Sequence, residues 1–255
     1  LEELLIPTFK KDSNSNNYYP DVRNPNFNNI IYNKKEFYKY KLSNQKIKKR
    51  SKLIEFIKSP TQKLLANYIN LKTPYNGILI WHSVGVGKTC TAISIAENFR
   101  DFAIKTKQKI LILTPGQKLK KSWLKEIFNS ERQNKLKKNE KLNVQCTEDY
   151  YTKIYKKLRE KYNKKTSQYK IEKLIQTIYE LKGYQELVGV IEKGMQDLKY
   201  GGIKNKESKL IAFLQDNFSN KVIICDEIHS IRVNTTDEDT KKISKYFQSL
   251  NMKKY

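Results

Sequence analysis

Long apolar runs are missing from this 255-residue sequence, in which no stretch reaches the roughly 18 consecutive apolar residues that a membrane-spanning helix needs. We therefore expect no transmembrane segment and no membrane partner. The opening residues, LEELLIPTFKK, also lack the basic-then-apolar pattern of a cleavable secretory signal. We expect this end of the sequence to be an excised or processed boundary.

Cysteine and histidine are scarce. The three cysteines, Cys90, Cys146 and Cys225, are odd in number and widely spaced, so a disulfide framework is not expected and a reducing compartment is favoured. The two histidines, His82 and His229, show no spacing typical of zinc ligands, so a zinc site is not expected either. Each histidine instead lies inside one of the two motifs described below.

Arginine is rare too, although the formal net charge is +25. Six of the 51 basic residues are Arg, and 51 minus 6 leaves 45 Lys. A strongly basic chain can bind nucleic acid by neutralising phosphates. An AT-rich genome, however, also enriches a sequence in Lys, Asn, Ile and Tyr, and Arg is the better phosphate ligand. Both explanations of the charge therefore stay open.

Short apolar runs alternate with segments of helical spacing, which is typical of an α/β fold with a mostly parallel sheet and helices on both faces. Buried strands are expected at residues 77–81, 109–114 and 222–225. Helices are expected at residues 34–57, from Ser59-Pro60 onward with an N-cap and a first-turn proline, at residues 88–100, and after Pro115.

Two regions depart from this pattern. Residues 1 to about 33 are rich in Asn, Ser, Tyr and Pro and show no period, so we interpret residues 1–50 as an irregular N-terminal arm, laid on the domain or partly disordered. Residues 51–255 would form the main domain. It carries a Lys- and Tyr-rich helical insert at about 130–215, in which LNVQC and TIYELKG are candidate strands.

A glycine loop, HSVGVGKT, lies between an expected strand and an expected helix. Its glycines permit positive φ and close approach of backbone N–H groups to phosphate oxygens at a helix N-terminus. Lys88 would reach the β- and γ-phosphates, and the Thr89 hydroxyl would bind Mg²⁺. The general pattern has glycine where His82 stands. The predicted nucleotide-binding residues are His82, Ser83, Val84, Gly85, Val86, Gly87, Lys88, Thr89 and Cys90.

An acidic pair, Asp226-Glu227, follows the last expected strand and begins the sequence DEIH. Ligands of parallel sheets collect at the carboxyl ends of the strands. There Asp226 could hold Mg²⁺, and Glu227 could orient and deprotonate an attacking water. DEIH alone is a weak signal, but its place about 140 residues after the glycine loop makes it much more specific.

Taken together, these motifs resemble those of superfamily 2 helicases and translocases. HSVGVGKTCTAI is similar to their first motif, DEIHSIR to their second, ILILTPGQKLKKSW to motif Ia and SPTQKLLANYI to the upstream glutamine motif. With a GYQELV segment in the same order, the sequence most resembles the helicase-like NTPases of large cytoplasmic DNA viruses. That group includes the poxvirus nucleoside triphosphatase I and the early transcription factor small subunit. The resemblance covers about residues 55–235.

The resemblance implies a RecA-like P-loop domain that hydrolyses ATP with Mg²⁺ and acts on nucleic acid. It implies that Lys88, Asp226 and Glu227 are catalytic, that Thr89 and Asp226 hold Mg²⁺, and that His229 couples the nucleotide state to the nucleic-acid path. Gln62 would read adenine, although it could be only an exposed helix residue. The implied contacts with the nucleic-acid backbone are Thr114, Pro115 and Gly116, of which Pro115-Gly116 could be only a turn. Trp123 is interpreted as a core residue.

The resemblance further implies a motor in viral transcription, with a viral RNA polymerase as a candidate partner. The expected location is the host cytoplasm, a viral factory or the virion. No third motif and no second RecA-like domain follow in this sequence, so we expect weak nucleotide binding and poor hydrolysis by this chain alone.

Two other functions stay open. One is an ATPase that remodels protein, although such AAA-type machines have a second motif without the equivalent of His229. The other is a non-catalytic scaffold that binds nucleic acid. The presence of Lys88, Thr89, Asp226 and Glu227 together argues against a scaffold.

Overall fold

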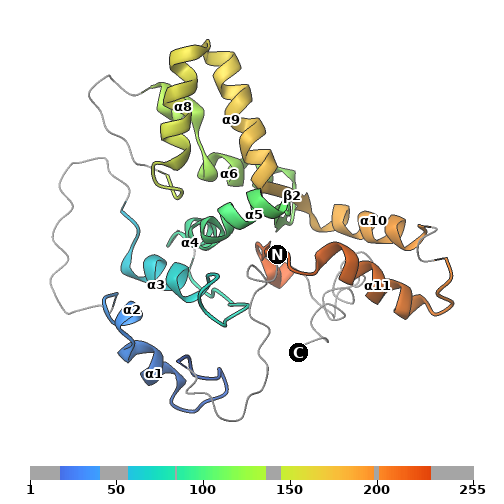
Figure 1. Cartoon of the computed structure of the whole chain (residues 1–255). Coiled ribbons are helices and arrows are strands. Elements are labelled where there is room, and N and C mark those ends of the chain that lie inside the picture. The colour runs from blue at the N-terminus through green and yellow to red at the C-terminus, as the bar shows by residue number, and fades with distance from the viewer. Residues whose placement is uncertain (1–17, 41–56, 84, 136–144, 198–200, 231–255) are drawn as a thin grey trace. The chain divides into compact units, whose positions relative to one another are not determined.

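The computed structural model describes residues 18–40, 57–83, 85–135, 145–197 and 201–230 (Figure 1). The chain divides into two compact units, which are described separately below. Unit 1 comprises residues 1–102 and 125–173, and unit 2 comprises residues 103–124 and 174–255. Three helices contain a boundary between the units: α5 (Arg100–Thr106), α6 (Gln117–Ile127) and α9 (Lys164–Ile178).

All the regular secondary structure among the described residues of unit 1 is helical. Its elements are α1 (Phe27–Asn33), α2 (Lys35–Tyr38), α3 (Pro60–Tyr68), α4 (Lys88–Ala96), the 3-10 turn η2 (Glu97–Phe99), α7 (Ser130–Asn134) and α8 (Tyr150–Lys161). As expected from Ser59-Pro60, the Ser59 hydroxyl caps α3 by accepting a hydrogen bond from the Gln62 backbone N–H at 3.2 Å.

Aromatic rings attach the described N-terminal residues to α3. Tyr68 of α3 stacks on Tyr75, with ring centroids 4.4 Å apart, and Phe27 of α1 meets the edge of Tyr75 at 5.6 Å. The Asn67 side chain donates to the backbone carbonyl of Glu36 at 2.8 Å. Residues 18–40 are therefore packed against α3 and the segment that follows it.

The later part of unit 1 is built around tyrosines of α8. Tyr151 is fully buried and donates its hydroxyl to the Glu97 carboxylate at 3.2 Å. Tyr155 is also buried, and its ring lies 5.3 Å from that of Phe128. These contacts fix the side of α8 that faces the interior of unit 1.

Unit 2 is organised by a three-stranded parallel sheet with the strand order β2-β1-β3. β1 (Ile110–Thr114) is buried throughout and pairs with β2 (Tyr179–Gly183) on one side and β3 (Ile223–Cys225) on the other. α10 (Tyr184–Met195) and α11 (Lys206–Phe218) contribute most of the apolar core that covers Leu111 and Leu113. A β-carbon at Gly194 would lie 1.9 Å from the Phe213 ring, so this close approach of α10 and α11 requires glycine.

The sheet confirms several expectations and corrects others. The expected strands at 109–114 and 222–225, the strand in TIYELKG and the helix after Pro115 are present as β1, β3, β2 and α6. The expected buried strand at 77–81 is wrong. These residues form no strand, and Leu79 and Trp81 are 69% and 84% exposed. No described residue pairs its backbone with this segment, so its side chains have no sheet in which to be buried.

Helix α1 also corrects the expectation of irregular structure through residue 33, because FNNIIYN forms a short helix without an obvious period. In LNVQC, the described residues Gln145 and Cys146 are a bend and a turn rather than a strand. The remaining expectations for residues 1–17, 41–56, 136–144, 198–200 and 231–255, and for Val84, lie outside the described residues. None of the helices in the described part of the chain has the length and apolar character needed to cross a membrane.

Candidate active site

The glycine loop of unit 1 leads directly into α4. Gly85 and Gly87 have φ angles of +81° and +85°, in the left-handed region that glycine adopts without a steric penalty. Gly87 is the N-cap of α4, so Lys88 and Thr89 occupy the first helical turn. The N–H groups of a first turn have no partner within their helix and face its N-terminal end. This is the local geometry of a phosphate-binding loop.

Gln62 joins α3 to this loop. Its side chain is 93% buried, and Nε2 donates to the Gly87 carbonyl at 3.4 Å, while Oε1 accepts from the Ser59 backbone N–H at 2.8 Å. The alternative of an exposed helix residue is therefore wrong. The same Gly87 carbonyl accepts from Thr91, through its backbone N–H at 2.9 Å and its hydroxyl at 3.0 Å. One loop carbonyl thus receives three donors.

Other loop residues differ in what they can offer a ligand. His82 has a buried Nδ1 atom without a hydrogen-bond partner among the described residues. Ser83 and Val86 are exposed. Cys90 is buried, and its sulfur is bonded to Cys146, so only its backbone could face a phosphate.

The Cys90–Cys146 disulfide corrects the expectation that the cysteines form no disulfide framework. The two residues are 56 positions apart in the sequence, but their Cα atoms lie 5.1 Å apart because both belong to the packed interior of unit 1. The pairing could not be predicted from the sequence because the two cysteines are so far apart in it. Cys225 is a free cysteine in unit 2, and burial raises the pKa of its thiol to about 12.

The acidic pair of unit 2 follows β3 directly. The Asp226 backbone N–H donates to the Leu113 carbonyl at 2.9 Å, which extends the β1–β3 pairing by one residue. Because the strands are parallel, Asp226 lies at the same edge of the sheet as Thr114 of β1 and Gly183 of β2.

Two aromatic side chains hold Asp226. Trp123 of α6 donates its indole N–H to the Asp226 carboxylate at 2.8 Å, and Tyr184 of α10 donates its hydroxyl to the Asp226 backbone carbonyl at 2.7 Å. Trp123 is 98% buried, which confirms it as a core residue. Burial, assisted by Cys225 and the acidic pair, raises the pKa of Tyr184 above its usual range and keeps its hydroxyl protonated as a donor.

Sequence reasoning missed this support. The indole donor needs an acceptor when buried, but nothing in the sequence pairs Trp123 with a residue 103 positions away. Tyr184 did carry a signal, because it lies in the GYQELV segment singled out by the family resemblance.

Glu227 and His229 lie in a tight turn at the start of η4 (Ile228–Ser230). Glu227 has a φ angle of +53°, which is uncommon for a residue with a β-carbon and concentrates at functional sites. His229 Nδ1 lies 3.2 Å from Glu227 Oε2. The local fold therefore brings together the predicted base and the predicted coupling residue.

The motif Ia turn offers less than predicted. Thr114 is fully buried and donates its hydroxyl to the Gly116 carbonyl at 3.2 Å, whereas Pro115 is exposed and Gly116 is partly exposed. Lys120 of the following helix is bound by Glu186 of α10 at 2.6 Å. Contact with nucleic acid at residues 114–116 stays a prediction.

These two motifs are typical of helicase-type P-loop proteins: a glycine loop that opens a helix, and an acidic pair that ends a parallel strand. The family model described as "Type III restriction enzyme, res subunit" matches residues 39–252. The chain belongs to this family, and its fold is therefore a RecA-like α/β domain.

Similar proteins are viral. Two belong to Acanthamoeba polyphaga mimivirus. "Putative ATP-dependent RNA helicase R563" is 34% identical over 84% of this chain and 31% of its own length, and "Putative ATP-dependent RNA helicase L377" is 27% identical over 94% and 22%. "Putative helicase 087L" of Invertebrate iridescent virus 3 is 33% identical over 44% of this chain and 12% of its own length. The chain thus spans less than a third of these relatives. No solved structure matches it.

Proposed function

We propose that this chain is the ATP-binding part of a nucleic-acid-dependent motor that acts in viral transcription. The observation that carries this proposal is the glycine loop, in which two left-handed glycines open α4 and put Lys88 and Thr89 in its first turn. The family membership and the viral relatives support it.

The residues of the loop fit the phosphates of ATP. The first turn of α4 supplies unsatisfied backbone donors, and a buried His82 nitrogen has no partner within the described chain. Lys88 would neutralise the β- and γ-phosphates. The Gln62 amide already forms hydrogen bonds with the Ser59 backbone N–H and the Gly87 carbonyl. We propose that the same amide also recognises the adenine base.

Thr89 of unit 1 and Asp226 of unit 2 each carry an oxygen donor of the kind that suits a hard cation. The Thr89 hydroxyl and the Asp226 carboxylate are the oxygen ligands that Mg²⁺ prefers. When bound, Mg²⁺ would neutralise charge on the phosphates. Trp123 and Tyr184 would fix the orientation of Asp226, and Glu227 would accept a proton from the attacking water. His229 would transmit the state of Glu227, which its Nδ1 atom contacts.

The polymer is proposed to be single-stranded nucleic acid. The two mimivirus relatives are named for RNA, which makes RNA the first polymer to test. A role beside a viral RNA polymerase, in the host cytoplasm, a viral factory or the virion, is part of the same proposal.

The experiment is ATP hydrolysis by the longer protein that contains this chain, with and without single-stranded RNA or DNA, beside its Glu227→Gln variant. We expect stimulation by nucleic acid that the variant loses, while the variant still binds nucleotide. Activity indifferent to both polymers would favour an ATPase that remodels protein. Nucleotide binding without any hydrolysis would favour the scaffold, and either result would overturn the proposal.

A further inference from the structure

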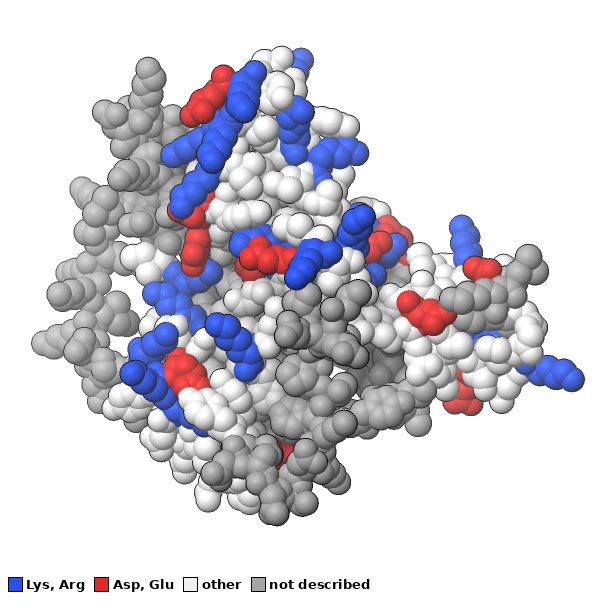
Figure 2. All heavy atoms as spheres, viewed as in Figure 1, with Lys and Arg blue, Asp and Glu red and all other residues white. Residues whose placement is uncertain are grey.

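Two consecutive helices of unit 1 carry an unusual excess of positive charge. α8 and the unit 1 part of α9 are joined by Tyr162 and Asn163. In α8 and α9 nine Lys and Arg face two Glu, which gives nine minus two, or +7. All nine basic side chains are exposed, and Figure 2 shows Lys and Arg side chains gathered at the top of the view. They are Lys153, Lys156, Lys157, Arg159, Lys161, Lys164, Lys165, Lys170 and Lys173.

The basic residues are arranged in stripes along the helices. On α8, Lys153, Lys157 and Lys161 recur every fourth residue, a spacing that aligns side chains on one helix face. On α9 the corresponding stripe is Lys165, Tyr169 and Lys173, all three exposed. The buried side chains of the two helices, from Tyr151 to Ile178, occupy the other positions. Each helix therefore has one packed face and one basic face.

Biased composition does not explain this surface. α10 and α11 of unit 2 come from the same Lys-rich sequence, yet their helical residues include three Lys and four Asp or Glu, or three minus four, a net charge of −1. A genome-wide enrichment in Lys would load both helix pairs alike. A solvated helix face also usually mixes charges of both signs, which α10 and α11 do and α8 and α9 do not.

Few carboxylates neutralise the basic face. Lys153 pairs with Asp149 at 2.6 Å, but within the described part of the chain no carboxylate lies within 4.0 Å of Lys157, Lys161 or Lys165. Lys120 of α6 differs, because Glu186 binds it and the hydrogen bond from Lys120 lowers the pKa of that carboxyl. Lys157, Lys161 and Lys165 therefore remain available to an anionic partner.

Exposed tyrosines lie among these lysines and narrow the class of partner. Tyr162 and Tyr169 are 42% and 60% exposed, and Lys170 and Lys173 lie over their rings at 4.6 and 5.5 Å. Alternating cations and aromatic rings suit a strand whose phosphates need neutralising and whose bases can stack. An acidic protein or a lipid headgroup would use the charge but not the rings.

We propose that the exposed face of α8 and α9 is a second nucleic-acid contact, which binds the backbone and bases of a single strand independently of the motif Ia turn. The proposal deepens the proposed nucleic-acid function and rests on it. None of the residues of this face belongs to the proposed nucleotide site, so its binding can be measured in the absence of nucleotide and hydrolysis.

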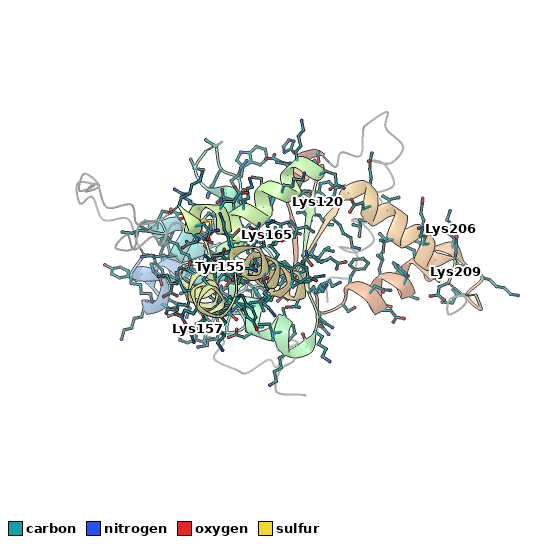
Figure 3. The ribbon with its side chains drawn as sticks, turned by 90° about the horizontal axis from the view of Figure 1, so that it is seen from above. Lys120, Tyr155, Lys157, Lys165, Lys206 and Lys209 are labelled. Carbon is teal, nitrogen blue, oxygen red and sulfur yellow. A yellow bond between two sulfur atoms is a disulfide. The ribbon has the colours of Figure 1, made fainter. Side chains whose placement is uncertain are left out.

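The test is the binding of a fluorescein-labelled, 20-nucleotide single-stranded RNA to the 255-residue chain, followed by anisotropy at several salt concentrations. The variant is Lys157→Gln, Lys161→Gln and Lys165→Gln combined. Its control of equal charge is Lys204→Gln, Lys206→Gln and Lys209→Gln, at and before α11. Figure 3 labels four of these six lysines, Lys157, Lys165, Lys206 and Lys209.

We expect the α8–α9 variant to bind about tenfold or more weakly at 0.1 M salt, with a slope of log K against log salt reduced by about 2. The α11 control should keep the affinity and slope of the wild type. Equal losses in both variants would assign the effect to net charge and overturn the proposal, as would an unchanged slope in the α8–α9 variant. Thermal melts of each variant show whether it is folded.

Tyr169→Ala separates nucleic acid from other anions. It should weaken RNA binding about fivefold or more. It should not change the affinity of the chain for polyglutamate, which is measured from the concentration that displaces RNA after correction for the weaker RNA binding. If Tyr169→Ala has no effect and polyglutamate displaces RNA as readily as unlabelled RNA does, the surface binds acidic protein and the proposal fails. If RNA binds at this surface but does not stimulate ATP hydrolysis by the longer protein, the proposed motor function fails. The proposed contact of α8 and α9 with nucleic acid then still holds.

Discussion

The two nucleotide motifs are held in place by different means. The glycine loop takes its shape from its own backbone, with two left-handed glycines, a helix start and one side chain from elsewhere, Gln62. The acidic pair depends on distant side chains, since Trp123 and Tyr184 reach Asp226 from positions 103 and 42 residues away.

This difference separates local from tertiary information. A loop fixed by glycines is specified by a few adjacent letters, so a change there should act on ligand binding with little effect elsewhere. A turn fixed by buried aromatic donors is specified by the packing of α6 and α10 against the sheet. A substitution that changes this packing should therefore lower the rate of ATP hydrolysis although the residues of the acidic motif are unchanged.

The largest effect is expected in the loop. Lys88→Ala removes the cation proposed to meet the β- and γ-phosphates, and losing one such stabilising group costs about 100- to 1,000-fold in turnover, or roughly 3 to 4 kcal/mol. The measurement is ATP hydrolysis by the longer protein, with nucleotide affinity of this chain as a second reading. Lys105→Ala, on the exposed surface of α5, is the matched control. Hydrolysis by Lys88→Ala at the rate of the control would contradict the assignment of Lys88 to the β- and γ-phosphates.

The next largest effect is expected from the Cys90–Cys146 disulfide, which anchors α4 at the residue that follows Thr89. Reduction, or Cys146→Ser, opens a 56-residue separation. We expect it to lower the free energy of unfolding by about 3 kcal/mol. Urea melts with and without reductant measure this. Cys225→Ser, which leaves the disulfide intact, should remain sensitive to reductant, whereas Cys146→Ser should become insensitive. Equal responses would contradict the link.

The acidic turn provides the next test. Trp123→Phe keeps a buried ring but removes the N–H that donates to the Asp226 carboxylate, and a hydrogen bond to a charged group contributes about 2 kcal/mol. We expect roughly a 30-fold loss in turnover and a higher Mg²⁺ requirement. Tyr184→Phe removes a bond to a neutral carbonyl, so its effect should be smaller, near 1 kcal/mol. A larger loss of turnover in Tyr184→Phe than in Trp123→Phe would mean that the hydrogen bond from Tyr184 to the Asp226 backbone carbonyl is the one that positions the turn.

The smallest expected effect distinguishes the two glycines. Gly85→Ala and Gly87→Ala both force a β-carbon into left-handed φ, at about 1 to 2 kcal/mol each. Only at Gly87 would that carbon also meet Gln62 Nε2, at 2.8 Å, whereas nothing lies within 4 Å at Gly85. Gly87→Ala should therefore weaken binding of a fluorescent ATP analogue by a further factor of about five, near 1 kcal/mol. Because Gln62 is itself proposed to contact the base, Gln62→Ala alone is the reference for the double variants. Measured against it, Gly85→Ala and Gly87→Ala should weaken binding equally, since the contact with Gln62 Nε2 is gone and only the backbone strain remains.

The sequence predicts most of what is local. Ser59-Pro60 predicted the start of α3, and the glycines predicted the loop before α4. The run ILILT predicted the buried strand β1, because a short apolar run bounded by Pro115-Gly116 is typical of a buried parallel strand.

Features that depend on packing could not be predicted in the same way. GILIW has the same apolar character as ILILT, but it has no partner strand among the described residues and leaves Trp81 exposed. The Trp123–Asp226 bond and the Cys90–Cys146 link both join residues more than 50 positions apart. Nothing local in either partner identifies the other.

The Cys90–Cys146 bond also turns 57 consecutive residues, among them β1 and α6, into a closed ring. A protease that cuts the chain once inside this ring leaves both products attached to each other. On a denaturing gel such a nicked protein would migrate as a single band until reductant separates it into two. Digestion that looks incomplete without reductant would then measure the ring and not the resistance of the fold.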